Sequence, residues 1–340
     1  MLNSIFRVCK KDEYRKAGPS DLIELLAIPG NHSLFILKRV LETLICGIVN
    51  AEFIHLSGPT GSAKSSLIEA LYLETKNFNA ICRALGFSLL PLKIYPIEMA
   101  TYETPGELYQ RRALKDGTTF DEKSSLVKAL EDAAMSKGKC YPVIWLREMG
   151  RVHTSSVQGG LLNLMTKDDI VLSDGTRFSG QGIAWIADSN YQAEEDSTHT
   201  LVTLDDALKR RFTINLTLDY LSAEQEVHVL KRIINENKKK NKKEYNDLIA
   251  KVVRLGKVIR QQRLEGNFQS LPPPTIWGYA AYLRMAQTLP QHSPQQIAKA
   301  TLLGNASSND RKLIPGLVNT VFGFQRTAQE DDPTMRGNLF

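Results

Sequence analysis

The segment Gly58–Ser65 constrains the fold of this chain more than any other feature. It follows an apolar run, Phe53–Leu56, and leads into a helix-like segment, Ser66–Tyr72. Its residues are Gly58, Pro59, Thr60, Gly61, Ser62, Ala63, Lys64 and Ser65. Glycines let the backbone aim its N–H groups at phosphate oxygens, and the N-terminus of the next helix adds a favourable dipole. The order of strand, glycine-rich loop and helix therefore predicts a phosphate-binding loop.

Two side chains at the end of this loop carry the expected chemistry. Lys64 is expected to reach the outer phosphates of a nucleotide, and the Ser65 hydroxyl to ligate Mg²⁺. Ala63 departs from the pattern G-x-x-x-x-G-K-[ST], which has a glycine before the lysine. The alternative is an ordinary glycine-containing turn before a helix, and the Lys-Ser pair with its flanking strand and helix argues against it.

Length and composition describe a globular chain with room for two domains. The 340 residues are 42% hydrophobic and 24% charged, with a net charge of +6. Much of the positive excess lies in Lys238–Lys243, which is either a solvated surface or a nucleic-acid contact. The cysteines form no C-x-x-C pair and indicate neither a zinc site nor a disulfide framework; they are Cys9, Cys46, Cys82 and Cys140.

The sequence does not predict a membrane protein. Met1–Lys11 lacks the apolar core of a signal peptide, and the apolar stretch Leu34–Val49 is interrupted by charged residues. We interpret Leu34–Val49 as an amphipathic helix packed beside the loop strand. A soluble, cytoplasmic protein is expected.

Apolar strand patterns alternate with helical patterns over the first two thirds of the chain. The strand candidates are Phe53–Leu56, Leu92–Ile97, Val143–Leu146, Ile183–Ala187 and Phe212–Leu218. The helical patterns are Ser65–Thr75, Leu126–Ser136 and Ser155–Leu164. Continuous apolar strands separated by helices predict an α/β fold with a mostly parallel sheet, which binds nucleotides at the carboxyl ends of its strands.

From Leu221 onward only helical patterns are convincing. Ser222-Ala223-Glu224-Gln225 is similar to a capping box. Further helices are expected at Leu248–Arg263, Thr275–Gln287, Pro294–Leu303 and Leu313–Val321. We predict a small all-α domain.

Hydrolysis needs groups beyond the loop, and the sequence offers candidates after later strands. Glu148 follows the strand Tyr141–Leu146 and lies where a water-activating glutamate is expected. Arg147 stands where an aspartate that helps to hold Mg²⁺ is expected. Its positive charge would therefore lie next to the metal ion.

Two further segments could contact the outermost phosphate. Asn190 follows the strand Ile183–Ala187, where it is either a turn residue or a hydrogen-bond donor to phosphate or water. Arg210 and Arg211 precede the next strand, and they either form a surface patch or supply a cationic finger, in cis or to a neighbouring subunit.

Together these signals resemble an AAA+ ATPase over residues 30–325. The closest resemblance is to the branch that contains MoxR-type ATPases, McrB, midasin and dynein. Alanine commonly precedes the lysine in MoxR-type loops, as Ala63 does here. Glu98–Tyr109 and its continuation to Leu130 resemble the hairpin insert of this branch. Glu148–Arg151, followed by Gly160–Met165, is similar to the MoxR segment after the catalytic glutamate.

The resemblance implies a role for each matching residue. Gly58, Gly61, Lys64, Ser65 and Ser66 match the nucleotide-binding loop, Glu148 the catalytic glutamate, Asn190 the first sensor, and Arg210 or Arg211 the trans-acting finger. Arg211 is favoured because it directly precedes Phe212. The second sensor has no clear counterpart, although Arg284 follows Thr275–Trp277 on the expected lid helix.

The residue patterns and the resemblance together predict the domain boundaries. They are an N-terminal extension over 1–29, a nucleotide-binding domain over 30–220 with a hairpin insert near 98–120, a helical lid over 221–325 and a polar tail over 326–340.

The leading hypothesis from this resemblance is an ATP- and Mg²⁺-dependent remodelling ATPase that works as a homo-oligomeric, hexameric ring. Relatives of this kind often act on a separate partner protein, frequently one with a von Willebrand factor A domain. One alternative is a nucleotide-switched scaffold with weak hydrolysis, which Arg147 motivates. Another is a McrB-like motor of a DNA-directed system, using ATP or GTP and contacting nucleic acid through Lys238–Lys243. A small-molecule kinase would leave the helical domain and the arginine pair unexplained.

Overall fold

The computed structural model describes residues 19–27, 32–115, 117–151, 154–172, 174–190, 204–234, 242–268, 271–304 and 306–323. The expected tail 326–340 and the lysines at 238–240 lie outside these residues. The chain divides into two compact units, Met1–Leu221 and Ser222–Phe340. Each unit is described by itself.

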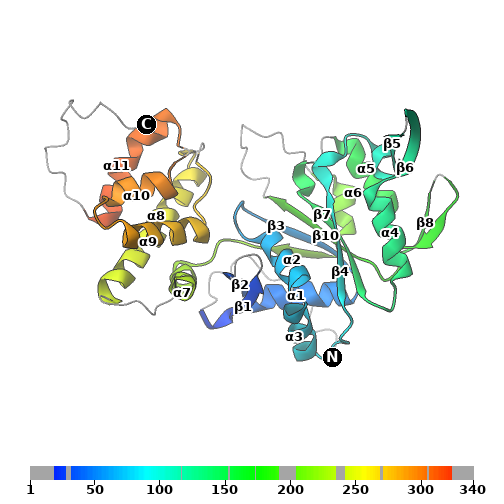
Figure 1. Ribbon diagram of the computed structural model, residues 1–340, viewed down its shortest axis with the longest axis horizontal. Helices are drawn as coiled ribbons and strands as arrows, with labels where there is room; N and C mark the ends of the chain where they lie inside the picture. The colour runs from blue at the N-terminus through cyan, green and yellow to red at the C-terminus, as the bar shows by residue number, and fades with distance from the viewer. Residues whose placement is uncertain are drawn as a thin grey trace. The chain divides into compact units, whose positions relative to one another are not determined.

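The first unit is built on a five-stranded sheet in which every pairing is parallel (Figure 1). The strand order is β11-β3-β10-β7-β4. The strands are β3 (Phe53–Gly58), β4 (Leu92–Glu98), β7 (Tyr141–Arg147), β10 (Ala184–Asn190) and β11 (Ile214–Thr217). The predicted α/β fold with a parallel sheet is confirmed, and all five expected strands form.

Helices cover both faces of this sheet, because successive side chains of a strand point to opposite faces and both sets are apolar. On β7, Trp145 packs into one apolar cluster and Ile144 into the other; on β10, Ile186 and Trp185 divide in the same way. The first cluster includes residues of α1 (Lys38–Val49), α2 (Lys64–Leu73) and α3 (Thr75–Leu85). The second includes residues of α4 (Ser125–Met135), α5 (Ser155–Leu164) and α6 (Asp206–Arg211).

The expected helix over Leu34–Val49 is wrong in its first part. β2 (His32–Leu37) pairs with β1 (Leu22–Ala27) in an antiparallel hairpin, and the helix α1 begins only at Lys38. Residues 34–37 are a continuous apolar run with no polar position at helical spacing, which suits a strand buried on both sides. Leu25 of β1 is buried in the cluster beside α1, so this part of the expected N-terminal extension belongs to the packed unit.

A second hairpin projects from the sheet unit within the region expected to carry the insert (Figure 1). It consists of β5 (Gln110–Lys115) and β6 (Thr118–Lys123), paired antiparallel. The short turns η4 (Met99–Thr101) and η5 (Pro105–Leu108) lead into it. Leu114 and Phe120 on this hairpin are exposed. A shorter hairpin pairs β8 (Asp169–Val171) with β9 (Arg177–Ser179).

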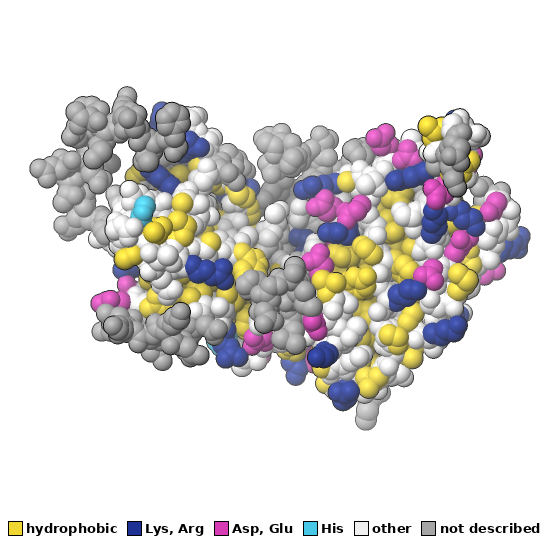
Figure 2. Space-filling model, in the orientation of Figure 1, with side chains coloured by type: hydrophobic (Ala, Val, Ile, Leu, Met, Phe, Trp, Pro, Cys, Tyr) yellow, Lys and Arg dark blue, Asp and Glu magenta, His cyan; other side chains and the backbone are white. Residues whose placement is uncertain are grey.

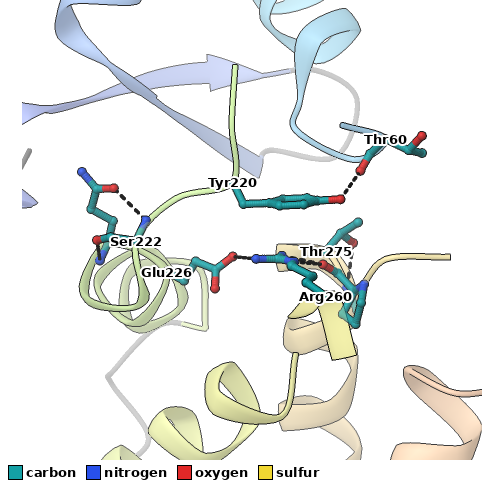
Figure 3. Close-up of polar contacts among 9 residues, drawn as sticks. Thr60, Tyr220, Ser222, Glu226, Arg260 and Thr275 are labelled. Carbon is teal, nitrogen blue, oxygen red and sulfur yellow. Dashed lines mark hydrogen bonds and ion pairs between the residues drawn. The ribbon is translucent and has the colours of Figure 1, made fainter. Parts of the chain in front are cut away.

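The second unit contains helices packed on one apolar cluster. They are α7 (Ala223–Ile233), α8 (Lys242–Leu264), α9 (Ile276–Thr288), α10 (Pro294–Thr301) and α11 (Ser308–Phe322). The expected capping box forms between Ser222 and Gln225 at the start of α7. Glu226 is buried and accepts a hydrogen bond from Arg260 at 2.7 Å, so this unit holds an ion pair in its interior (Figure 3).

The surface in Figure 2 shows basic side chains interspersed with acidic ones over the sheet unit. Lys242 and Lys243 begin α8, and their side chains lie outside the described part of the chain. Among the described residues, the structure contains no helix with the length and apolar character that crossing a membrane requires.

Candidate active site

The loop between β3 and α2 has a backbone that depends on small residues. β3 ends at Gly58, where a Cβ atom would lie 2.1 Å from the carbonyl oxygen of Leu218. Gly61 has a φ of 79°, in the left-handed region that glycine adopts without steric cost. Ala63 also lies there, with φ 69° and ψ 24°, directly before the first helical residue. The loop is therefore tightly wound between the strand and the helix.

Lys64 is held inside this loop, with a relative exposure of 7%. Its Nζ donates to the carbonyl oxygens of Gly58 and Pro59, both at 2.9 Å, and to Oδ1 of Asn190 at 3.0 Å. Burial lowers the pKa of Lys64 to about 8, against the opposing influence of the Asp188 carboxylate. The lysine thus brings a cationic group to the point where the loop meets β10.

β10 lies next to the loop strand and continues farther than expected. The strand runs through Asn190, which is paired in register with Gly58, and so Asn190 is a strand residue and not a turn residue. Asp188, in register with Leu56, is buried at 3% exposure. The two side chains are two residues apart and share the face of the sheet that α2 covers.

Asp188 connects three parts of the site, and the sequence reasoning did not identify it as a site residue. Its Oδ1 accepts from Nε1 of Trp145 at 2.8 Å and from the backbone N–H of Glu148 at 3.3 Å. Its Oδ2 accepts from the Ser65 hydroxyl at 3.3 Å. Burial raises the pKa of Asp188, and these hydrogen bonds oppose the rise. The available signal was an acidic residue directly after the apolar run Ile183–Ala187.

Arg147 makes its contacts outside the loop. Its guanidinium pairs with Glu98 at 2.6 Å and with Glu69 at 3.9 Å, and it lies over the Trp145 ring at 4.8 Å from the centroid. Glu98 ends β4 and Glu69 belongs to α2. The positive charge of Arg147, which was expected to lie beside the metal ion, is therefore balanced by two carboxylates.

Glu148 turns the chain at the end of β7. Its φ of 51° is left-handed, a conformation that costs of order 1–3 kcal/mol for a non-glycine residue and that is found often at active sites. Its backbone N–H faces Asp188, and its carboxylate pairs with Arg151 at 3.1 Å while remaining 45% exposed. The glutamate is thus linked to the loop through Asp188.

Arg210 and Arg211 are not gathered at this site. Both are exposed at the end of α6, which precedes β11. Ile214 of β11 is level with Ile54, four residues before Gly58, or about 13 Å along the strand. The arginines therefore lie toward the amino-terminal edge of the sheet, whereas the loop lies at the carboxyl edge. Arg284 is exposed on α9 of the second unit.

One further contact to the loop comes from the segment after β11. The Tyr220 hydroxyl donates to the carbonyl oxygen of Thr60 at 2.8 Å (Figure 3). The Ser62 hydroxyl is buried, and it has no hydrogen-bond partner among the residues that the structure describes. The contact between Tyr220 and Thr60 could not be inferred from the loop sequence alone.

The arrangement suits an anion and a hard metal ion bound side by side. Lys64 and the helix N-terminus provide positive charge and N–H donors for an anion. The Ser65 hydroxyl and the Asp188 carboxylate are oxygen ligands of the kind that Mg²⁺ prefers, so the residues present fit this metal. No protein-family model matches the chain, and no curated protein matches it.

Proposed function

We propose that the protein binds a nucleoside triphosphate, ATP above all, in the loop Gly58–Ser65 and hydrolyses it. One observation carries this proposal: two adjacent loop residues hydrogen-bond the end of the neighbouring parallel strand. Lys64 donates to Asn190 and Ser65 donates to Asp188, at the carboxyl edge of the sheet. In open α/β sheets ligands bind at this edge, and the N-terminus of the helix after the loop favours phosphate.

Each residue then has a task that follows from its position. Lys64 holds the outer phosphates, and the loop N–H groups orient them. Glu148, beside this group at the end of β7, orients the attacking water, and Asn190 hydrogen-bonds the water or the outermost phosphate. When bound, Mg²⁺ would supply positive charge that offsets the charge developing on phosphate oxygens.

We also propose that the nucleotide acts between subunits of an AAA+-type ring that remodels a partner protein. The exposed arginines at the end of α6 support this proposal, because the loop Gly58–Ser65 of the same chain lies at the other edge of the sheet. The exposed Leu114 and Phe120 of the β5–β6 hairpin provide an apolar contact for a partner. Light scattering with and without ATP and Mg²⁺ tests it, and a protein that remains monomeric under both conditions contradicts the ring.

Nucleotide binding is tested by calorimetry on wild type, Lys64→Ala and Lys76→Ala. Loss of the charge-assisted contacts should weaken ATP binding by about 10- to 100-fold in Lys64→Ala. Lys76 is an exposed lysine on α3, so its variant is the matched control and should bind as wild type does. Equal affinity in all three proteins would show that the loop is not the binding site.

Hydrolysis is tested by phosphate release from the Glu148→Gln variant. Removing a group that orients water should lower the rate by about 100-fold or more and leave ATP affinity near the wild-type value.

A second candidate function, a nucleotide-controlled switch with slow turnover, is favoured by the Glu148–Arg151 ion pair, which occupies the carboxylate. It predicts that wild type binds ATP normally and releases phosphate no faster than Glu148→Gln.

A further inference from the structure

The position of Asp188 gives the site a carboxylate from an unexpected strand. A charged group buried in the middle of a sheet is costly unless hydrogen bonds or an ion compensate it. Asp188 is 3% exposed and lies on the face of β10 that α2 covers. Its burial is therefore a feature that the fold maintains at a cost, beside the first residues of α2.

The two oxygens of this carboxylate have different surroundings. Oδ1 is fixed by Trp145 and by the backbone N–H of Glu148. Among the described residues, Oδ2 has Ser65 as its hydrogen-bond partner, at a long 3.3 Å. An ionised carboxylate oxygen has more than one lone pair, so Oδ2 retains capacity to accept beside the serine. If Ser65 donates its proton to Asp188, the lone pairs of its hydroxyl remain available to a metal ion.

The metal-binding acid was expected at the end of β7, and β7 carries Arg147 there instead. Arg147 is paired with Glu98 and Glu69 and lies over Trp145. Trp145 in turn donates to Asp188, so the same indole lies between the displaced cation and the buried carboxylate.

We propose that Asp188 supplies the carboxylate that holds Mg²⁺ beside Ser65, so that β10 performs the task for which β7 carries no acid. This inference rests on the proposed nucleotide site. β10 then carries both the metal-holding acid, Asp188, and the phosphate-facing amide, Asn190, two residues apart on one face.

The experiment measures the affinity of Mn²⁺, a spectroscopic substitute for Mg²⁺, by electron paramagnetic resonance with full-length protein and a non-hydrolysable ATP analogue. Asp188→Asn keeps an oxygen for Trp145 but removes the charge. We expect it to weaken Mn²⁺ binding by about tenfold or more. Its affinity for the analogue in EDTA should stay within about twofold of wild type, since the loop contacts are unchanged.

Two further variants keep the test decisive even if Asp188→Asn folds poorly in a melting experiment. Arg147→Asp alters a partly exposed residue and puts an acid on β7. Because Asp188 already provides the charge, Mn²⁺ affinity should change by less than about threefold. Glu98→Gln removes a nearby carboxylate that has no place in the metal site, and should leave Mn²⁺ affinity unchanged.

The outcomes separate this inference from the proposed function. Unchanged Mn²⁺ affinity in Asp188→Asn, or a gain of about tenfold or more in Arg147→Asp, overturns the assignment of Asp188 while nucleotide binding stands. If wild type binds the analogue no better than Lys64→Ala, with or without Mn²⁺, the nucleotide site itself is wrong and the assignment falls with it.

Discussion

At the scale of single residues, the site contains two non-glycine residues in the left-handed region, Ala63 and Glu148. A Cβ atom in this conformation approaches the following carbonyl oxygen, which glycine avoids. Ala63 has only a methyl side chain, so its strained backbone does not position a polar group. Glu148 carries a carboxylate that pairs with Arg151.

Replacing Ala63 by glycine should stabilise the fold. Relief of the left-handed strain exceeds the entropy that glycine adds to the unfolded chain, so we expect the free energy of unfolding to rise by about 0.5–1 kcal/mol. Urea denaturation measures the change. Ala70→Gly, in the interior of the following helix, is the control and should lose about 1 kcal/mol. Equal destabilisation of the two variants would show that Ala63 is not strained.

His55 should make stability depend on pH. Its ring stacks on Phe212, its Nε2 lies 2.7 Å from the Ser189 hydroxyl, and Asn215 also hydrogen-bonds it. Burial lowers the pKa of His55 below its ordinary value of 6.5. The neutral His55 ring contributes its full share of stability above pH 6.5, and this share is lost as the pH falls toward the lowered pKa. The reason is that in this range His55 binds a proton in the unfolded chain but not in the native chain.

Melting curves of wild type and His55→Gln between pH 5 and pH 7.5 check this expectation. The stability difference between the two proteins should shrink on acidification, with a limiting slope of about 1.4 kcal/mol per pH unit for one proton. Other titrating groups, such as Asp188 and Glu226, are common to both proteins and cancel in the difference. Parallel curves would mean that the His55 pKa is the same in both states.

At the scale of elements, two adjacent glycines on α5 have opposite surroundings. A Cβ at Gly160 would lie 2.8 Å from Leu108 Cδ1 and 3.2 Å from Pro105 Cβ, whereas one at Gly159 would meet nothing within 4 Å. Leu108 and Pro105 belong to the turn η5 that leads into the β5–β6 hairpin. The close approach of α5 to η5 therefore depends on Gly160.

Alanine at each position gives a matched pair of predictions. Gly160→Ala should destabilise the protein by about 1–3 kcal/mol through overpacking. Gly159→Ala should stabilise it by about 0.5–1 kcal/mol through helix propensity alone. Thermal unfolding of both variants provides the measurement, and changes of the same sign would argue against the packing of α5 on η5.

The strands were predictable because their runs are short, mostly apolar and separated by polar segments. The first helix was predicted to begin too early because residues 34–37 lead directly into the mostly apolar α1, and the pairing of β2 with β1 separates the two. α3 was not expected at all. A single residue, Glu74, separates it from α2, and no side chain caps its start.

Within the site, Lys64, Ser65 and Asn190 were predictable from local order along the chain. Asp188 was not, because its position depends on which face of β10 meets α2 and on Trp145 of a neighbouring strand, 43 positions earlier. The contacts of Arg147 likewise depend on the pairing of β7 with β4, which brings Glu98 alongside.

At the scale of the whole molecule, the proposed site would be completed by a second copy of the chain. Arg211→Ala should then lower phosphate release by about 10³-fold while ATP binding to the altered chain is retained. Lys64→Ala should lose phosphate release and bind ATP about 10- to 100-fold more weakly. Mixing the two inactive proteins should restore part of the activity, because one chain contributes an intact loop and the other an intact arginine.

Phosphate release from the mixture, titrated against either variant alone, measures this recovery. Arg112→Ala, which alters an exposed arginine of the hairpin, is the control and should release phosphate without a partner variant. A mixture that stays inactive while both proteins co-assemble would show that Arg211 does not act on a neighbour.

The three hydrogen bonds of Lys64 affect how tightly a ligand binds and how the chain responds to it. Two loop carbonyls and the Asn190 side chain already satisfy its ammonium group. A phosphate that binds Lys64 therefore competes with oxygens that the chain supplies, and affinity is the difference between two sets of contacts. If Asn190 is the partner exchanged, arrival of phosphate at the loop frees the Asn190 side chain, while the backbone of β10 stays paired with β3. Occupancy of the loop would then be felt on β10 as a reorientation of the Asn190 amide.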